Sequence, residues 1–248
     1  MIKNNGVLKS LPISYNWDND FLIRTFTEND IRNFTDEYKS RISECYLEVW
    51  GESLKNLCSY AEAEENVSNL LNFAGEKNTN FTREIIVISR KREIVGFCGY
   101  DFYNDLSKGP CTPYIKNDYQ DLLRKALQAS SFWVYKVLDK HEPVILIKSM
   151  VLKKHYRVGL TPNFIKTMYA RKAKEHPFTV VCVKFGCKSL NWFLGLGMYP
   201  LYNCPESEMI FLGGSSEKML EVCESFINNN DYVDRYSEIN ENANKFFF

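Results

Sequence analysis

The chain has 248 residues, a quarter of them charged, and its 31 basic side chains balance its 31 acidic ones. A chain of this length buries a sizeable core in one large domain, with or without appendages. Because the net charge is zero, the sequence excludes the overall positive field that favours nucleic acid or an anionic membrane surface, and we expect neither as a partner. The apolar run at residues 143–147 is far too short to span a bilayer.

The N-terminus and the cysteines indicate the compartment. Residues 1–20 lack the continuous apolar run and the small-residue cleavage site of a secretory signal, so we expect a cytoplasmic protein. The eight cysteines include no Cys-x-x-Cys pair, and the chain has only three histidines. We therefore expect reduced, mostly buried thiols and no metal site.

Hydrophobic periodicity predicts the elements of the first half of the chain. Thr27 is suited to cap a helix whose apolar positions recur at spacings of three and four. Runs of Ile and Val on either side of a polar turn indicate an antiparallel hairpin, and Gly96 and Gly99 in its second strand indicate a bulge or a close backbone approach. The expected elements are a strand at 21–26, a helix at 27–51, short helices at 54–61 and 67–73, and hairpin strands at 85–89 and 94–100.

The second half adds a long helix, several strands and a closing helix. Apolar stripes predict amphipathic helices before residue 140 and near the C-terminus. The dense Val, Ile and Leu after residue 143 are typical of a buried strand. The expected elements are a helix at 117–140, a strand at 144–152, a helix from 161, a strand at 178–183, a short helix at 189–194, strands at 198–202 and 208–212, and a helix at 215–228.

Residues 144–173 form the stretch around which the rest is organised. A basic loop at 153–159 follows the strand, and Thr161 with Pro162 is typical of a helix start. A strand, a glycine turn and a helix N-terminus aim several backbone N–H groups at one anion. Residues 144–174 contain eight Lys or Arg and no Asp or Glu. This pattern predicts an anion-binding turn, and an ordinary strand–turn–helix with a solvated basic face stays open as the alternative.

The order of these elements resembles the GNAT (general N-acetyltransferase) superfamily. The likeness rests on residues 23–31, on the hairpin segment 92–97, and on 144–173 followed by 193–198. It implies an α/β (α+β) fold with a mixed, mostly antiparallel central sheet flanked by helices, an extra helix inserted before the central strand, and a C-terminal helix. The expected organisation is an N-terminal arm at 1–20, a GNAT-like domain at 21–213 with an insertion at 104–141, and a C-terminal helix and tail at 214–248.

The resemblance also implies a cofactor, acetyl-CoA or another acyl-CoA. In the family, the loop after the central strand wraps the CoA pyrophosphate with backbone N–H groups, and the strand edge before it pairs with the pantetheine. One position of the family often holds a tyrosine that protonates the leaving thiolate, and Phe193 occupies that position here. The cofactor-binding residues so implied are Met150, Val151 and Leu152 on the strand, Tyr156, Arg157, Val158, Gly159, Leu160 and Thr161 in the loop, and Asn191 and Phe193 downstream.

The leading functional hypothesis is an acyl-CoA-dependent N-acyltransferase that moves an acyl group directly to an amine, whose identity the sequence leaves open. We expect Tyr199 to donate a proton and Ser149 to position a water, although both also suit structural roles. Two alternatives remain. One is a long-chain acyl donor, as acyl-CoA or on an acyl carrier protein, which the basic clusters around Lys153 and Lys166 suit. The other is a non-catalytic domain that binds acyl-CoA or a partner protein, which Phe193 favours. The C-terminal helix and Phe-rich tail allow a homodimer.

Overall fold

The computed structural model describes residues 21–51, 59–71, 81–105, 125–129, 133–156, 166–185, 188–204 and 208–229. Within them, seven strands form one sheet in the order β1-β2-β3-β4-β5-β7-β6. The strands are β1 (Phe21–Thr27), β2 (Phe81–Arg90), β3 (Glu93–Tyr103), β4 (Val144–Leu152), β5 (Phe178–Lys184), β6 (Tyr199–Cys204) and β7 (Met209–Ser215). Neighbouring strands are antiparallel except β4 and β5, which are parallel. The predicted mixed, mostly antiparallel sheet is therefore confirmed.

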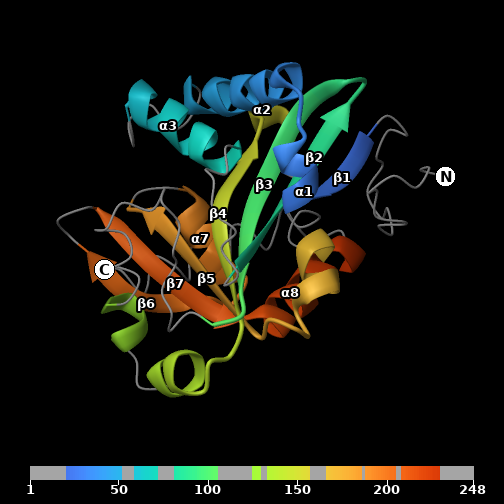
Figure 1. Cartoon of the computed structure of the whole chain (residues 1–248). Helices are drawn as coiled ribbons and strands as arrows, with labels where there is room; N and C mark the ends of the chain where they lie inside the picture. Colours follow the sequence, from blue (N-terminus) through green and yellow to red (C-terminus); the bar gives the residue numbers. More distant parts are fainter. Residues whose placement is uncertain are drawn as a thin grey trace.

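Helices cover both faces of this sheet (Figure 1). One face carries α7 (Lys188–Gly195), α8 (Ser216–Asn229) and the helical residues 166–172, and they share a single apolar cluster with every strand of the central sheet except β6. The other face carries two separate clusters. Helices α1 (Glu28–Arg32), α2 (Asp36–Val49) and α3 (Tyr60–Leu71) form one of them. Residues 125–129 and 133–137, which include part of the π-helical segment η3 (Val134–Asp139), form the other.

The border between these two clusters is polar. Alternate residues of a strand point to the same face, so Phe81, Arg83 and Ile85 of β2 all point to this one. Phe81 belongs to the cluster around η3, Ile85 belongs to the cluster around α1–α3, and Arg83 lies between them. On β3, Asp101 holds the same intermediate position, directly opposite Arg83.

The first helices differ from the sequence prediction. Thr27 does cap α1, where its backbone N–H donates to Asp30 Oδ2 at 2.8 Å. The single helix expected at 27–51 is wrong, because Thr35 starts a second helix by accepting a hydrogen bond from the Tyr38 N–H at 3.2 Å. The division into short helices at 54–61 and 67–73 is also wrong, since α3 contains both Ala61 and Val67; residues 52–58 and 72–73 lie outside the described residues.

In the second half, the continuous helix expected at 117–140 is interrupted. Residues 125–128 are helical and end in a turn at Ala129, and η3 follows as a π-helix; residues 117–124 and 130–132 lie outside the described residues. The apolar stripe is confirmed by the buried side chains of Ala126, Leu127, Trp133 and Val137. The strand at 178–183, the short helix after it and the closing helix are confirmed as β5, α7 and α8.

The predicted close approach at Gly99 is confirmed. A Cβ on Gly99 would collide with the side chain of Leu70 on α3, so the absence of a side chain lets α3 lie against β3. No helix in the described ranges is long and apolar enough to cross a bilayer. The five described cysteines are thiols, four of them buried. The N-terminal arm at 1–20 and the tail after residue 229 lie outside the described residues.

Candidate active site

A gap opens in the middle of the sheet, because β4 and β5 pair only at one end. Their register joins Val144–Ile147 to Phe178–Val181 and stops there. Beyond Ile147, β4 continues along β3 and β5 continues along β7, and the two strands diverge (Figure 1). Side chains of β4 are buried through Ile147 and become half-buried at Lys148, Ser149 and Met150. This change places the mouth of the gap at those three residues.

A bulge in β4 coincides with the divergence. Tyr100 of β3 is opposite Ile147 and Gly99 is opposite Ser149, which leaves Lys148 as the extra residue. A bulge bends its strand and increases the local twist, so β4 turns away where its pairing with β5 ends. Residues two apart on a strand point to the same face, so Lys148 points with Leu146 to the face that carries α3. Ser149 is opposite Gly99, which lies against Leu70 of α3, so the Ser149 side chain points to that face as well.

The backbone of β4 presents hydrogen-bonding groups to the gap. The Lys153 N–H donates to the Val95 carbonyl on β3 at 2.9 Å. Backbone groups of a strand alternate in direction, so those of Leu152 and Met150 point away from β3 and into the gap. No described strand pairs with them there. The gap therefore has one edge to which an extended ligand is able to add by main-chain hydrogen bonds.

A buried ion pair forms the wall beside the bulge. Arg83 Nε and Nη2 donate to the two Asp101 carboxylate oxygens at 2.5 and 2.8 Å, and the two side chains are only 2% and 0% exposed. Arg83 Nη1 also donates to the carbonyl oxygens of Asn69 and Leu70 at the end of α3, at 3.1 and 3.3 Å. The pair thus ties β2, β3 and α3 together and fixes the position of Asp101 next to the bulge.

Lys148 lies in the field of this pair. Burial lowers the pKa of the Lys148 amine, and Asp101 raises it less than burial lowers it. Arg83 lowers the pKa further, and the Cys182 thiol, on β5 just past its last pair with β4, raises it. A lowered pKa makes it easier for the Lys148 ammonium to lose its proton, so Lys148 is a candidate for proton transfer beside the gap.

Comparison with known proteins gives structural matches only, since neither a family model nor a curated protein matches the chain. The chain is similar to a CoA-dependent acyl-homoserine lactone synthase (TM-score 0.50, 11% identity, 84% of this chain and 89% of that chain). It is also similar to an N-acyl amino acid synthase from uncultured soil microbes (TM-score 0.47, 6% identity, 80% and 92%). A third match is a GNAT-family protein from Desulfovibrio desulfuricans (TM-score 0.45, 8% identity, 78% and 99%). The chain has the GNAT fold.

In this GNAT fold, Tyr199 lies far from the gap. Tyr199 is the first residue of β6. It is opposite Gly213 of β7, which is opposite Val180 of β5, which in turn is opposite Leu146 of β4. Three strand spacings of about 4.8 Å put it roughly 14 Å from β4, beside the paired end of β4. Trp133 Nε1 donates to the Tyr199 hydroxyl at 2.5 Å. The structure therefore does not bring Tyr199 close to Ser149, and the roles expected of them, proton donor and water-positioning group, stay predictions.

Two further positions implied by the resemblance lie on α7, which follows the open end of β5. Phe193 is 2% exposed and packs edge-on against Trp192, with ring centroids 5.3 Å apart, so it is part of the core. Asn191 is half-buried on the same helix. Tyr156 ends the short segment η4 (Lys154–Tyr156) and packs edge-on against Phe21 at 5.7 Å. The remaining loop residues, 157–161, lie outside the described residues.

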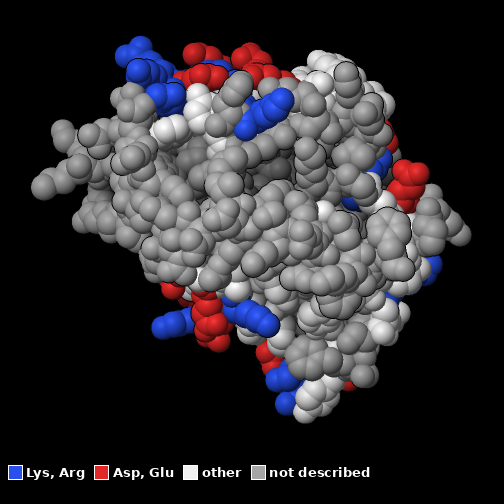
Figure 2. All heavy atoms as spheres, turned by 180° about the vertical axis from the view of Figure 1, so that it is seen from behind, with Lys and Arg blue, Asp and Glu red and all other residues white. Residues whose placement is uncertain are grey.

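Four of the basic residues around the loop form ion pairs with acidic side chains of the chain itself. Lys153 contacts the carboxylates of Glu48 and Glu93, the latter at 2.6 Å. The other pairs are Lys166 with Glu224 at 3.5 Å, Arg171 with Glu84 at 3.3 Å, and Lys172 with Glu175 at 3.5 Å. Figure 2 shows the same mixing on the rear of the molecule, where basic and acidic side chains lie next to each other. These cations therefore give little support to an acidic carrier protein as the acyl donor.

Proposed function

We propose that this chain is an acyl-CoA-dependent N-acyltransferase that transfers an acyl group directly from CoA to an amine. The observation that carries the proposal is the open edge of β4, where the backbone groups of Met150 and Leu152 face the gap beside a bulge. The resemblance implies that the pantetheine of acyl-CoA pairs with this edge, ahead of the pyrophosphate loop at 156–161. The fold shared with a CoA-dependent synthase supports CoA as the donor.

Positioning supplies most of the rate enhancement in this scheme. A pantetheine that adds to β4 as an extended strand carries its thioester toward the bulge, where β4 and β5 meet. The amine approaches from the face to which Lys148 and Ser149 point, so the two substrates meet from different sides of the sheet. Holding both in place removes the entropy cost of a bimolecular encounter. Ser149 positions a water on the face from which the amine approaches.

Lys148 is the proton carrier in this proposal, in place of Tyr199. The amine nitrogen attacks the thioester carbon and forms the C–N bond, and the C–S bond breaks with its electron pair leaving on sulfur. Lys148, once its ammonium has lost a proton, accepts the proton that the nitrogen loses and returns it to the thiolate. The products are the amide and CoA, and no other reactant is consumed. Such proton transfer contributes about 10²–10⁴-fold in rate.

The test is release of CoA thiol from acetyl-CoA in the presence of a panel of amines. Lys148→Met should lower kcat by at least about 100-fold and leave stabilisation by CoA unchanged. Lys140→Met, which removes an exposed lysine after η3, should behave as the unchanged protein. Activity that survives Lys148→Met would remove Lys148 from the mechanism. If CoA does not stabilise the unchanged protein, the proposal that acyl-CoA is its cofactor is wrong.

Binding without catalysis is the second candidate, and the core position of Phe193 favours it. A buried phenyl ring has no proton to give, so the family's usual donor is missing from its expected helix. This candidate predicts thermal stabilisation by acetyl-CoA with no thiol release from any amine. A series of acyl-CoA lengths in the same assay tests the long-chain alternative, because a long acyl tunnel would make turnover rise with chain length.

A further inference from the structure

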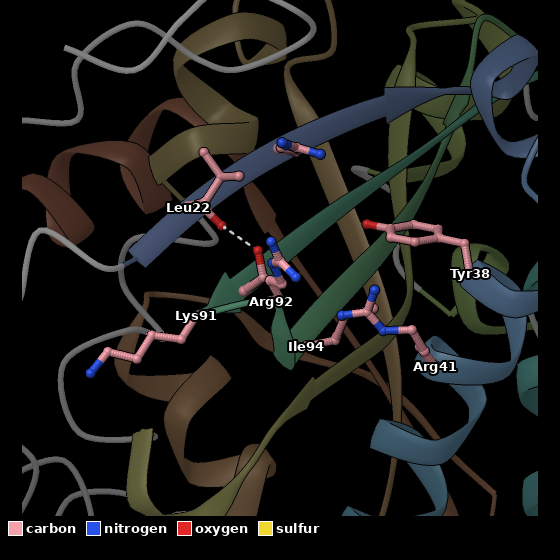
Figure 3. Close-up of a pocket in the computed structure, with 8 residues that line it drawn as sticks. Leu22, Tyr38, Arg41, Lys91, Arg92 and Ile94 are labelled. Carbon is pink, nitrogen blue, oxygen red and sulfur yellow. Dashed lines mark hydrogen bonds between the residues drawn. The ribbon is translucent and has the colours of Figure 1, made fainter.

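A cavity lies at the turn of the β2–β3 hairpin, away from the gap between β4 and β5. It has a volume of about 330 Å³ and lies between β1, the β2–β3 turn and the first turns of α2 (Figure 3). Four of its lining residues are cations, Arg24, Arg41, Lys91 and Arg92, and no lining residue is a carboxylate. Because the whole chain has no net charge, this cluster of positive charge is specific to the pocket.

Three of these cations lack a carboxylate partner within the described part of the chain. No ion pair joins Arg24, Arg41 or Arg92 to any described Asp or Glu. This contrasts with Lys153 and Arg171 near the cofactor loop, which are paired. Figure 3 shows Arg41 from α2 and Arg92 from the turn reaching toward the same space, while Lys91 extends away from it. Guanidinium groups that converge without an anion repel each other, and an anion between them removes that repulsion.

The turn that carries Lys91 and Arg92 has an unfavourable backbone for these residues. Their φ angles are 47° and 77°, in the left-handed region. This conformation is unfavourable for an L-residue with a Cβ, and two-residue hairpin turns of this kind prefer Asn-Gly. Retaining two long cations there, at a cost in stability, is typical of a functional position rather than a structural one.

The remaining walls suit an anion of limited size. Tyr38 is held by edge-on contacts with Phe26 and Phe34, at centroid distances of 5.7 and 4.8 Å. Burial raises the pKa of the Tyr38 phenol, and Arg24 and Arg41 lower it less, so the hydroxyl stays protonated and able to donate to an anion. A volume of about 330 Å³ is at the small end of ligand pockets and favours a compact molecule.

We propose that this pocket binds a compact polyanion carrying two or more phosphate or carboxylate groups. Arg41 and Arg92 grip the anion from opposite walls, Arg24 adds a third positive charge, and Tyr38 donates a hydrogen bond. Strands β2 and β3 separate this pocket from the edge of β4 that faces the gap. The site is thus distinct from the proposed cofactor site, and its ligand does not react.

Calorimetric titration with tripolyphosphate and, separately, with citrate tests the proposal. Saturating CoA is present in both titrations, so that phosphate groups cannot occupy the proposed cofactor loop. We expect one site per chain, with affinity that falls steeply as salt is raised. The two arms distinguish phosphate from carboxylate as the preferred group. Arg41→Gln should weaken binding at least about tenfold, because it removes a charge-assisted hydrogen bond to the anion.

The matched control is Arg32→Gln, which removes an equal charge from α1, where Arg32 pairs with Glu28 at 2.7 Å. It should bind as the unchanged protein. Arg41→Lys keeps the charge and should retain part of the affinity, which separates loss of binding from loss of folding. The proposal is overturned if neither polyanion binds, or if Arg41→Gln and Arg92→Gln bind as tightly as Arg32→Gln. Failure of acyl transfer in the Lys148 assay leaves these titrations unaffected.

Discussion

Replacing Asp101 by Asn breaks the buried pair beside the bulge and keeps the shape of the side chain. Arg83 would then keep its charge at 2% exposure, facing a neutral amide in place of the carboxylate that now accepts two of its hydrogen bonds. Removing one partner of a buried pair costs about 3–5 kcal/mol, because the other charge is left uncompensated. This is a large share of the roughly 5–15 kcal/mol that a domain has in total. For a chain of this length, about 2–4 °C per kcal/mol gives a fall in Tm of roughly 6–20 °C.

Urea unfolding followed by circular dichroism measures this loss. Glu28→Gln is the control, since it breaks the exposed pair with Arg32 on α1 and should cost only about 0.3–0.5 kcal/mol. The double change Arg83→Met with Asp101→Leu removes both charges and should recover most of the stability lost in Asp101→Asn. A loss below about 1 kcal/mol for Asp101→Asn, or a double variant less stable than the single one, would refute this account of the pair.

Three other perturbations have expected outcomes. Gly213→Ala places a Cβ 2.5 Å from a ring carbon of Trp133, so it should cost about 1–3 kcal/mol, and an unchanged Tm would contradict this packing. Burial lowers the pKa of the His176 imidazole below its ordinary 6.5, so its contribution to stability is present above that pH and is lost as the pH falls. His176→Phe should flatten the pH dependence of urea unfolding below pH 6.5. An unchanged pH profile would show that His176 does not cause that dependence. Lys91→Asn combined with Arg92→Gly should raise stability by about 1–2 kcal/mol in urea unfolding while weakening polyanion binding; a less stable protein would show that the turn is unstrained.

The strands were predictable because each depends on residues adjacent in sequence. The runs of Ile and Val in β2 and β4 are buried on both faces, and that continuous apolar pattern is visible without any knowledge of partners. The start of α2 was predictable in principle, since Thr35 is followed by Asp36 and Glu37, a usual N-terminal pattern. Apolar spacing of three and four continues across that break, which is why the periodicity alone merged α1 with α2.

The site depends on cross-strand register, which the sequence pattern does not contain. A bulge at Lys148 shifts the facing of every later residue in β4, yet it leaves no mark on the local composition. Tyr199 follows Gly197 by two residues, but three strand spacings separate it from Leu146. Arg83 and Asp101 meet because β2 and β3 pair in one register, so neither residue identifies the other in advance.

The gap between β4 and β5 gives the sheet two inner edges in addition to its outer edges at β1 and β6. Unpaired strand edges accept foreign strands, and no described strand pairs with these two inner edges, so they are suited to the addition of an extended ligand. A ligand that covers these edges protects them, and by mass action it adds about 2.7 kcal/mol of stability at 100 times its Kd. If acyl-CoA pairs with β4 as proposed above, solubility and resistance to unfolding should therefore follow its supply.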